Sequence, residues 1–187
     1  MCTRKPGLCL LVLIPLALAG CGLLQDSNRD GGSLNPDGGL PDAGTTEAFA
    51  MLEDQVLVLV NQRRSQGAYC ASVSYPPAPP MSMNASLRIA ARLHSQDMAN
   101  NDYFSHVSQD GRTFDQRIRN AGYASSFLGE NIAAGLPTAE GTMDAWMNSP
   151  GHCSNIMDGR FRAIGVGYGY RSGSTYTHYW TQDFGGN

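Results

Sequence analysis

The stretch RAIGVGYGY (residues 162–170) places a glycine at every second position from Gly165 to Gly169. Large apolar side chains occupy the positions between these glycines. Alternation with a period of two predicts a β-strand. One face of this strand is bare, which is typical of a strand on which another backbone lies directly. We therefore expect a second element to pack closely against the glycine face.

Two other segments have the length and composition of strands, GENIAAG (residues 129–135) and THYWTQDF (residues 177–184). The first contains a single charge, Glu130, among glycine and small apolar residues. A carboxylate in such a segment raises the question of which polar partners the fold brings to it.

Four segments are predicted to be helical. They cover residues 47–66, residues 84–99, a short stretch from Thr113 to near Gly122, and PTAEGTMDAWMNS (137–149). The four prolines in SYPPAPP (74–80) predict a loop. Helices outnumber strands and no regular βαβ order appears, so the pattern predicts an α+β layered domain.

The N-terminus is typical of a secretory signal. Two basic residues precede an apolar run (residues 8–18) that is too short to span a bilayer. The sequence Leu-Ala-Gly-Cys that ends at Cys21 resembles the lipobox of bacterial lipoproteins, whose cysteine is acylated. The alternative is an ordinary signal peptide followed by a chance cysteine.

Residues 22–46 are rich in Gly, Asp, Pro and Ser and have no apolar period, which predicts a flexible tether. We expect a lipoprotein signal peptide (1–20), a tether with lipidated Cys21 (21–46) and one domain (47–187). Such a chain belongs to the bacterial cell envelope, lipid-anchored at the outer membrane or cell surface on the extracytoplasmic side. The formal net charge of −3 and the lack of basic blocks argue against a nucleic-acid partner. We expect a monomer whose membrane contact comes from the lipid.

Five cysteines separate by position. Two lie within the predicted signal and Cys21 is the acylation candidate, which leaves Cys70 and Cys153. Two spare cysteines in an oxidising compartment predict a disulfide.

The polar residues that suggest chemistry are His106, Glu130 and His152, with Ser105 and Ser149 close to the histidines in sequence. No HExxH, CxxC or GxSxG motif is present. Two neutral imidazoles and a carboxylate form a common zinc-binding set. The same residues also suit a hydrogen-bonded cluster in which Glu130 holds a histidine charged. The spacing leaves both interpretations open.

Two other histidines have structural interpretations. His94 lies on the core-facing stripe of the second predicted helix, where a histidine is usually packed and hydrogen-bonded. His178 shares a strand face with Trp180.

Six motifs occur in a consistent order: HSQDMANNDYFSHVSQDGRTFDQRI, AGY, GENIAAG, WMNSPGHCSNIM, IGVGYGY and YWTQDFG. Together they resemble the bacterial branch of the CAP superfamily, the cysteine-rich secretory, antigen 5 and pathogenesis-related proteins, whose domain is also called SCP. The resemblance covers residues 49–185 and implies an α-β-α sandwich.

Many members of this superfamily have a cleft with two histidines, which hold a divalent cation, and two glutamates. The resemblance assigns the histidines to His106 and His152 and the first glutamate to Glu130. The plant and animal branch carries the second glutamate three residues after the tryptophan of the fourth helix, and that position here is Ser149. The carboxylate pair of the family is therefore broken at this position.

The resemblance implies three classes of function. One is a metal-binding cleft with hydrolase, protease-like activity, in which His106 and His152 hold a divalent metal such as zinc and Glu130 or the metal activates water. Ser105 and Ser149 are further cleft candidates. The alternative is a non-catalytic binding module for lipid, sterol-like or cell-envelope ligands, and the third is a structural domain. The sequence leaves open whether the protein is an enzyme.

Overall fold

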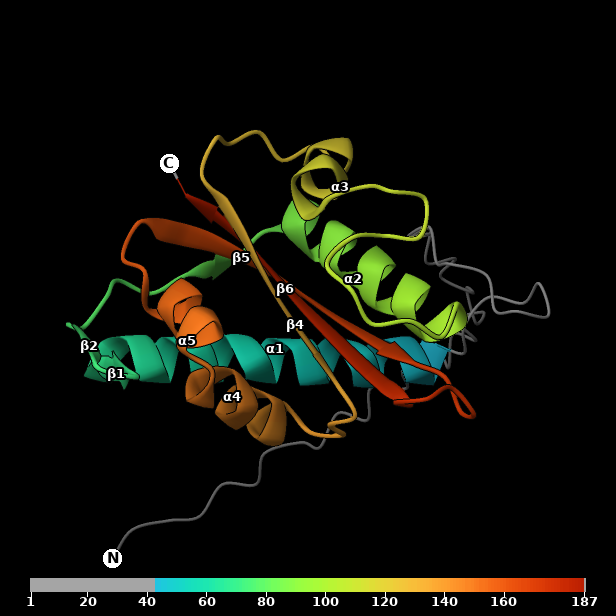
Figure 1. Cartoon of the computed structure of the whole chain (residues 1–187), viewed down its shortest axis with the longest axis horizontal. Coiled ribbons are helices and arrows are strands. Elements are labelled where there is room, and N and C mark those ends of the chain that lie inside the picture. Colours follow the sequence, from blue (N-terminus) through green and yellow to red (C-terminus); the bar gives the residue numbers. More distant parts are fainter. Residues whose placement is uncertain (1–42, 187) are drawn as a thin grey trace, which may run out of the picture. The chain divides into compact units, whose positions relative to one another are not determined.

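The computed structural model describes residues 43–186 (Figure 1). The predicted signal peptide, lipidated Cys21 and the tether up to residue 42 lie outside these residues. The helices are α1 (Ala43–Gln66), α2 (Ala85–Asn100), α3 (Phe114–Asn120), α4 (Ala139–Asn148) and α5 (Pro150–Met157). The strands are β1 (Ala68–Cys70), β2 (Val73–Tyr75), β3 (Ser82–Met83), β4 (Leu128–Ala134), β5 (Phe161–Tyr170) and β6 (His178–Gly186).

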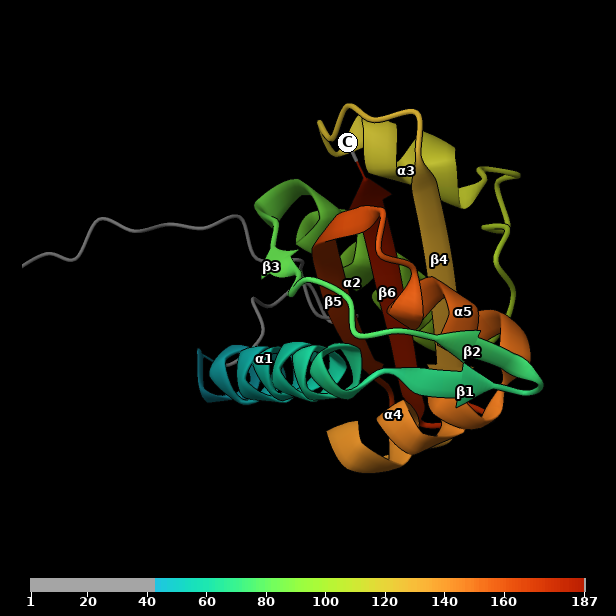
Figure 2. The ribbon, with the colours of Figure 1, turned by 90° about the vertical axis from the view of Figure 1, so that its left-hand side faces the viewer.

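The centre of the fold is a four-stranded sheet in the order β3-β5-β6-β4. Strand β6 is antiparallel to both β5 and β4, and β3 runs parallel to β5. Helices α2 and α3 cover one face of the sheet, and α1, α4 and α5 cover the other (Figures 1 and 2). The expected α+β class and α-β-α sandwich are confirmed.

The glycine face of β5 lies directly beneath α2. A Cβ atom added at Gly165 would overlap the main chain of Leu87, and one added at Gly167 would overlap the main chain of Ala91. The expected close approach of a second backbone is confirmed, and the partner is a helix. The loop that follows this helix reaches the edge strand β4, where His106 contacts Glu130.

The other face of the sheet holds the larger core. Helices α1, α4 and α5 bury their apolar stripes there against side chains from β5 and β6. Its fully buried members include Val56, Val60, Met143, Trp146, Ile156, Ile164, Val166, Trp180 and Phe184. Burial of each such side chain contributes on the order of 1.5–3 kcal/mol.

Several short elements differ from the sequence expectations. Helix α1 begins at Ala43, four residues before the expected start. Part of the predicted loop 74–80 is strand, since Ser74 and Tyr75 pair with β1 in a hairpin. Helix α5 was not expected, because its start at Pro150 and Gly151 is typical of a turn. None of the helices in the described part of the chain is long and apolar enough to cross a membrane.

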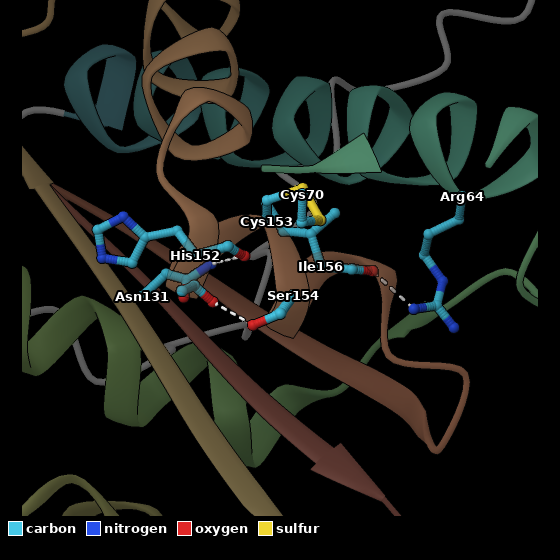
Figure 3. The surroundings of a disulfide bond; sticks show 8 residues. Arg64, Cys70, Asn131, His152, Cys153, Ser154 and Ile156 are labelled. Carbon is cyan, nitrogen blue, oxygen red and sulfur yellow. Dashed lines mark hydrogen bonds between the residues drawn. A yellow bond between two sulfur atoms is a disulfide. The ribbon is translucent and has the colours of Figure 1, made fainter. Parts of the chain in front are cut away.

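The predicted disulfide is confirmed. It joins Cys70 of β1 to Cys153 of α5, with Cα atoms 5.5 Å apart (Figure 3). The buried guanidinium of Arg64 fixes the C-terminal end of α5 by donating to the carbonyl oxygens of Ile156 (2.7 Å) and Asp158 (2.9 Å). Burial lowers the pKa of Arg64 to about 10, which leaves it charged at neutral pH. Helix α5 is therefore held in its middle by the disulfide and at its C-terminal end by Arg64.

Candidate functional site

The candidate site is built around Glu130 on the edge strand β4. Its side chain is fully buried and accepts two charge-assisted hydrogen bonds. Arg117 Nη2 donates to one carboxylate oxygen at 2.5 Å, and His106 Nδ1 donates to the other at 2.8 Å. The His106 side chain remains 50% exposed, so its second ring nitrogen is open to a ligand. This geometry answers why a carboxylate stands in the GENIAAG segment.

Arg117 on α3 organises the loop that carries His106. Besides Glu130, it donates from Nη1 to the carbonyl oxygens of His106 (3.0 Å) and Arg112 (3.1 Å) and to Ser108 Oγ (3.2 Å). Its side chain is 4% exposed. One buried cation thus ties the loop to β4 and neutralises Glu130.

His94 on α2 also contacts the loop that carries His106. Its Nε2–H donates to the carbonyl oxygen of Ser105 at 2.9 Å, and the residue is 1% exposed. Burial lowers the pKa of His94 to about 4, a shift that the charge of Glu130 opposes. The ring is therefore neutral at pH 7, in agreement with the interpretation of His94 as a packed, hydrogen-bonded core residue.

His152 approaches the site from α5, on the opposite face of the sheet. Asn131 of β4 donates to its carbonyl oxygen at 3.1 Å and accepts from Asn155 of α5 at 2.9 Å, which docks the helix on the strand. Figure 3 shows its ring turned away from the disulfide. Burial, and then the charge of His106, lower the pKa of His152. Because β4 is an edge strand, side chains from both layers can approach each other beyond it.

A second carboxyl lies beside Glu130 and was not identified from the sequence. Asp183 of β6 is the direct cross-strand neighbour of Glu130 and is fully buried. Neither of its oxygens has a hydrogen-bond donor among the described residues. Burial, and then the charge of Glu130, raise the pKa of Asp183 well above its ordinary value, while Arg117 opposes the rise. The family position at Ser149 lacks an acid, but β6 supplies another one.

The remaining candidates from the sequence lie outside this hydrogen-bonded group. Ser105 Oγ accepts from the Val107 amide at 3.0 Å, and Ser149 sits at the junction of α4 and α5. Within the described residues neither serine hydroxyl is hydrogen-bonded to a histidine. His178 Nδ1 contacts the Tyr168 hydroxyl at 2.6 Å at the start of β6, as expected of a strand residue.

The donor set is too small for a complete protein-only metal site. In residues 43–186 no group of three or more His, Cys, Asp or Glu side chains is placed to hold a metal ion. Both oxygens of the buried Glu130 carboxylate are engaged by Arg117 and His106, so Glu130 itself is not placed to bind a metal ion. His106 and His152 offer two imidazoles, fewer than the three protein ligands of a typical catalytic zinc site or the four of a structural one.

Two site residues that sequence reasoning missed had weak signals. Arg117 falls one position before the buried Ile118 on the inner side of a short predicted helix, where an arginine needs a buried partner. Asp183 is the third polar residue in a row in a predicted strand, and because all three are buried, solvent exposure does not explain the polar run. Neither signal names Glu130 as the shared partner.

Comparison with known proteins agrees with this architecture. A family model described as the cysteine-rich secretory protein family, CAP, matches residues 57–184. The chain is 40% identical over 134 residues to the uncharacterized protein YkwD of Bacillus subtilis (strain 168), and the match covers 71% of this chain and 46% of YkwD. It therefore spans less than half of that relative's length.

Two solved structures show the same fold. An extracellular protein containing an SCP domain from Bacillus anthracis str. Ames matches with a TM-score of 0.65 at 28% identity, over 83% of this chain and 45% of that one. An outer surface protein from Borrelia burgdorferi matches with a TM-score of 0.59 at 18% identity, over 76% of this chain and 95% of that one. From its motifs, its fold and these matches, the chain belongs to the CAP, or cysteine-rich secretory protein, family.

Proposed function

We propose that this protein is an extracytoplasmic, envelope-anchored CAP-domain lipoprotein whose His106 and His152 side chains bind a divalent metal ion. We propose zinc, because imidazole is a ligand that suits it. The observation that carries the proposal is the 2.8 Å hydrogen bond from His106 Nδ1 to buried Glu130. Lipidated Cys21 supplies the anchor. Likeness to an extracellular SCP-domain protein supports the location.

The Glu130 contact prepares His106 for metal binding. A metal-binding histidine usually donates its other ring N–H to a carboxylate, which sets the tautomer and the ring orientation. Here the Glu130 carboxylate accepts a hydrogen bond from Nδ1–H of His106, so the lone pair of the half-exposed ring lies on Nε2. Arg117 holds Glu130 from the opposite side, which keeps this orientation rigid.

His152 supplies the second imidazole. The pKa of His152 is lowered by burial and by the charge of His106, so its ring is neutral and able to bind a metal at pH 7. Imidazole is a ligand that suits zinc, and a site with only these two protein ligands would leave the remaining positions of the ion to water or to a bound molecule. The amide of Asn131 holds this part of α5 against β4.

The arrangement supports metal binding more directly than hydrolysis. A bound divalent ion polarises a carbonyl group or lowers the pKa of a water molecule. Glu130 cannot also act as a general base while Arg117 and His106 occupy both of its oxygens. Hydrolase, protease-like activity would therefore need a general base other than Glu130. Metal-dependent binding of a molecule without hydrolysis needs no such base.

Calorimetric titration with zinc tests the proposal. The protein is stripped with chelator and held at about pH 7.5, where ordinary histidines are neutral. We expect saturable binding that is lost in His106→Ala and in His152→Ala. We expect Glu130→Gln to weaken binding about 10–100-fold, as is typical when a carboxylate behind a ligand is removed.

His178→Ala is the matched control, because His178 is bonded to Tyr168 rather than to the site. It should bind zinc like the wild type. A wild-type protein without saturable zinc binding would refute the metal site and favour the non-catalytic binding module. Equal loss of binding in His178→Ala would refute the assignment of the ligands.

A further inference from the structure

We propose that Asp183 is held as the neutral acid, donates a hydrogen bond to Glu130 and thereby acts as the positioning residue of the Glu130–His106 pair. This inference rests on the proposed function, in which His106 is the residue of this cluster that binds the metal. Asp183 itself reaches no ligand, since its side chain is fully buried.

The sheet register brings the two acids together. Glu130 and Asp183 are directly opposite in the antiparallel β4–β6 pair, so their side chains project from the same face. Such neighbours have Cβ atoms about 4.5–5.5 Å apart. On the other side of Asp183 the register partner is Gly165, which has no side chain and lies beneath α2. Asp183 is therefore enclosed by two strands and a helix, and Glu130 is its polar neighbour in the register.

Hydrogen-bond satisfaction sets the charge state of Asp183. No donor reaches either oxygen among the described residues. A carboxylate in that position would be buried without compensation, which is strongly unfavourable. A protonated carboxyl is different, because it becomes a donor and the adjacent Glu130 carboxylate can accept its hydrogen. Burial and the charge of Glu130, which raise the pKa of Asp183, act in the same direction.

The surrounding charges agree with one proton on the pair. Arg117 from α3 is the cation at this position, and it is already paired with Glu130 at 2.5 Å. His94 from α2 is neutral at pH 7, because its pKa is about 4. His106 from the loop is bonded to the outer oxygen of Glu130. One cation thus balances one carboxylate, and a second negative charge on Asp183 would have no partner.

The consequence is a carboxylate held from three sides. Arg117 and His106 each donate to one oxygen of Glu130, and protonated Asp183 donates from the adjacent strand. Rotation of Glu130 would then break all three bonds together. Asp183 thereby positions the site without touching a ligand.

Carbon-13 NMR of the full-length protein with labelled aspartate carboxyl groups tests the charge state. Asp183→Asn identifies the signal by its loss. We expect the Asp183 signal at the position of a protonated carboxyl from about pH 5 to 7. Exposed Asp110, whose pKa is lowered by hydrogen bonds from Arg112, is the internal reference for an ionised carboxylate. An Asp183 signal at the ionised position throughout this range would overturn the proposal.

Two substitutions test the positioning role. Asp183→Asn keeps a donor for Glu130, whereas Asp183→Ala removes it. Nitrogen-15 spectra of His106 should show Nδ1 protonated in the wild type and in the Asn variant and a mixture of tautomers in the Ala variant. Zinc affinity should fall at least about tenfold in Asp183→Ala and be retained in Asp183→Asn. An Asn variant that matches the Ala variant in both measurements would refute the role.

The outcomes remain separable. If the wild type binds no zinc, the proposed function fails, while the carboxyl and His106 spectra still decide the state and role of Asp183. If Asp183→Ala does not fold, the carboxyl titration of the wild type and the His106 spectrum of Asp183→Asn carry the test.

Discussion

The buried ring of His94 predicts a specific sensitivity of this fold to acid. Its Nε2–H donates to the Ser105 carbonyl, and its Nδ1 has no hydrogen-bond partner among the described residues. Burial lowers the pKa of His94 from 6.5 to about 4 in the folded protein. As the pH falls through 6.5, His94 becomes protonated in the unfolded chain but stays neutral in the folded protein. Stability that is fully present above pH 6.5 is therefore lost between pH 6.5 and 4.

The size of the loss follows from the two pKa values. One pKa unit corresponds to about 1.4 kcal/mol of differential interaction. The difference between 6.5 and about 4 then removes about 3 kcal/mol of folding free energy by pH 4. That is a large part of the about 5–15 kcal/mol by which domains are stable.

His94→Gln isolates this contribution. Glutamine can keep an N–H donor for the Ser105 carbonyl and does not titrate, so its packing cost is the same at each pH. Urea unfolding at about pH 7.5 and about pH 4, followed by the fluorescence of buried Trp146 and Trp180, measures the free energy of unfolding. We expect the wild type to lose about 3 kcal/mol relative to His94→Gln between the two pH values.

A difference between the two proteins that stays constant across this pH range would refute the reasoning. It would mean that His94 titrates alike in the folded and unfolded states, so that the ring is not excluded from water. A change of opposite sign would mean that Glu130 outweighs burial and holds His94 charged.

Two further predictions concern the scaffold. Gly167→Ala should lower the free energy of unfolding by about 1–3 kcal/mol or more, because the added methyl group overlaps the main chain of Ala91. Gly159→Ala is the control and should change it little, because its methyl group meets no atom. Thermal melting of both variants tests this, and equal melting temperatures would contradict the close contact. Replacing both Cys70 and Cys153 by Ala should cost about 4 kcal/mol in urea unfolding, because the bond closes a separation of 83 residues. An unchanged urea midpoint would show that the bond adds no stability.

The sheet and its main helices were predictable because their signals are local. Alternating glycines identified β5 and the close approach of a second backbone, and the apolar period of 84–99 placed His94 in the core. The hairpin β1–β2 and helix α5 were missed because they are too short to show a period. Their stability comes from the disulfide, from Arg64 and from packing, all of which join residues far apart in the sequence.

Only part of the site could be predicted: the structure joins His106 to Glu130 by a hydrogen bond, whereas a metal site shared with His152 stays a prediction. Family motifs led to His106, Glu130 and His152, since these residues stand in recognisable stretches. Arg117 and Asp183 stand in two of the same motifs (residues 94–118 and 179–185), but their position beside Glu130 depends on the strand register and on where α3 packs. Period and composition cannot supply these. A buried carboxyl without a donor becomes visible only when every neighbour of the residue is known.

The position of His152 depends on whether the bond between Cys70 and Cys153 has formed. Cys153 directly follows His152, so the covalent link that fastens α5 to the hairpin also fastens one of the two imidazoles. A newly made chain in a reducing cytoplasm lacks this link and holds His152 only through packing and the amide of Asn131. If the chain is exported as proposed, the bond forms only after it leaves the cytoplasm, and a thiol reductant would act on the proposed metal affinity as well as on stability.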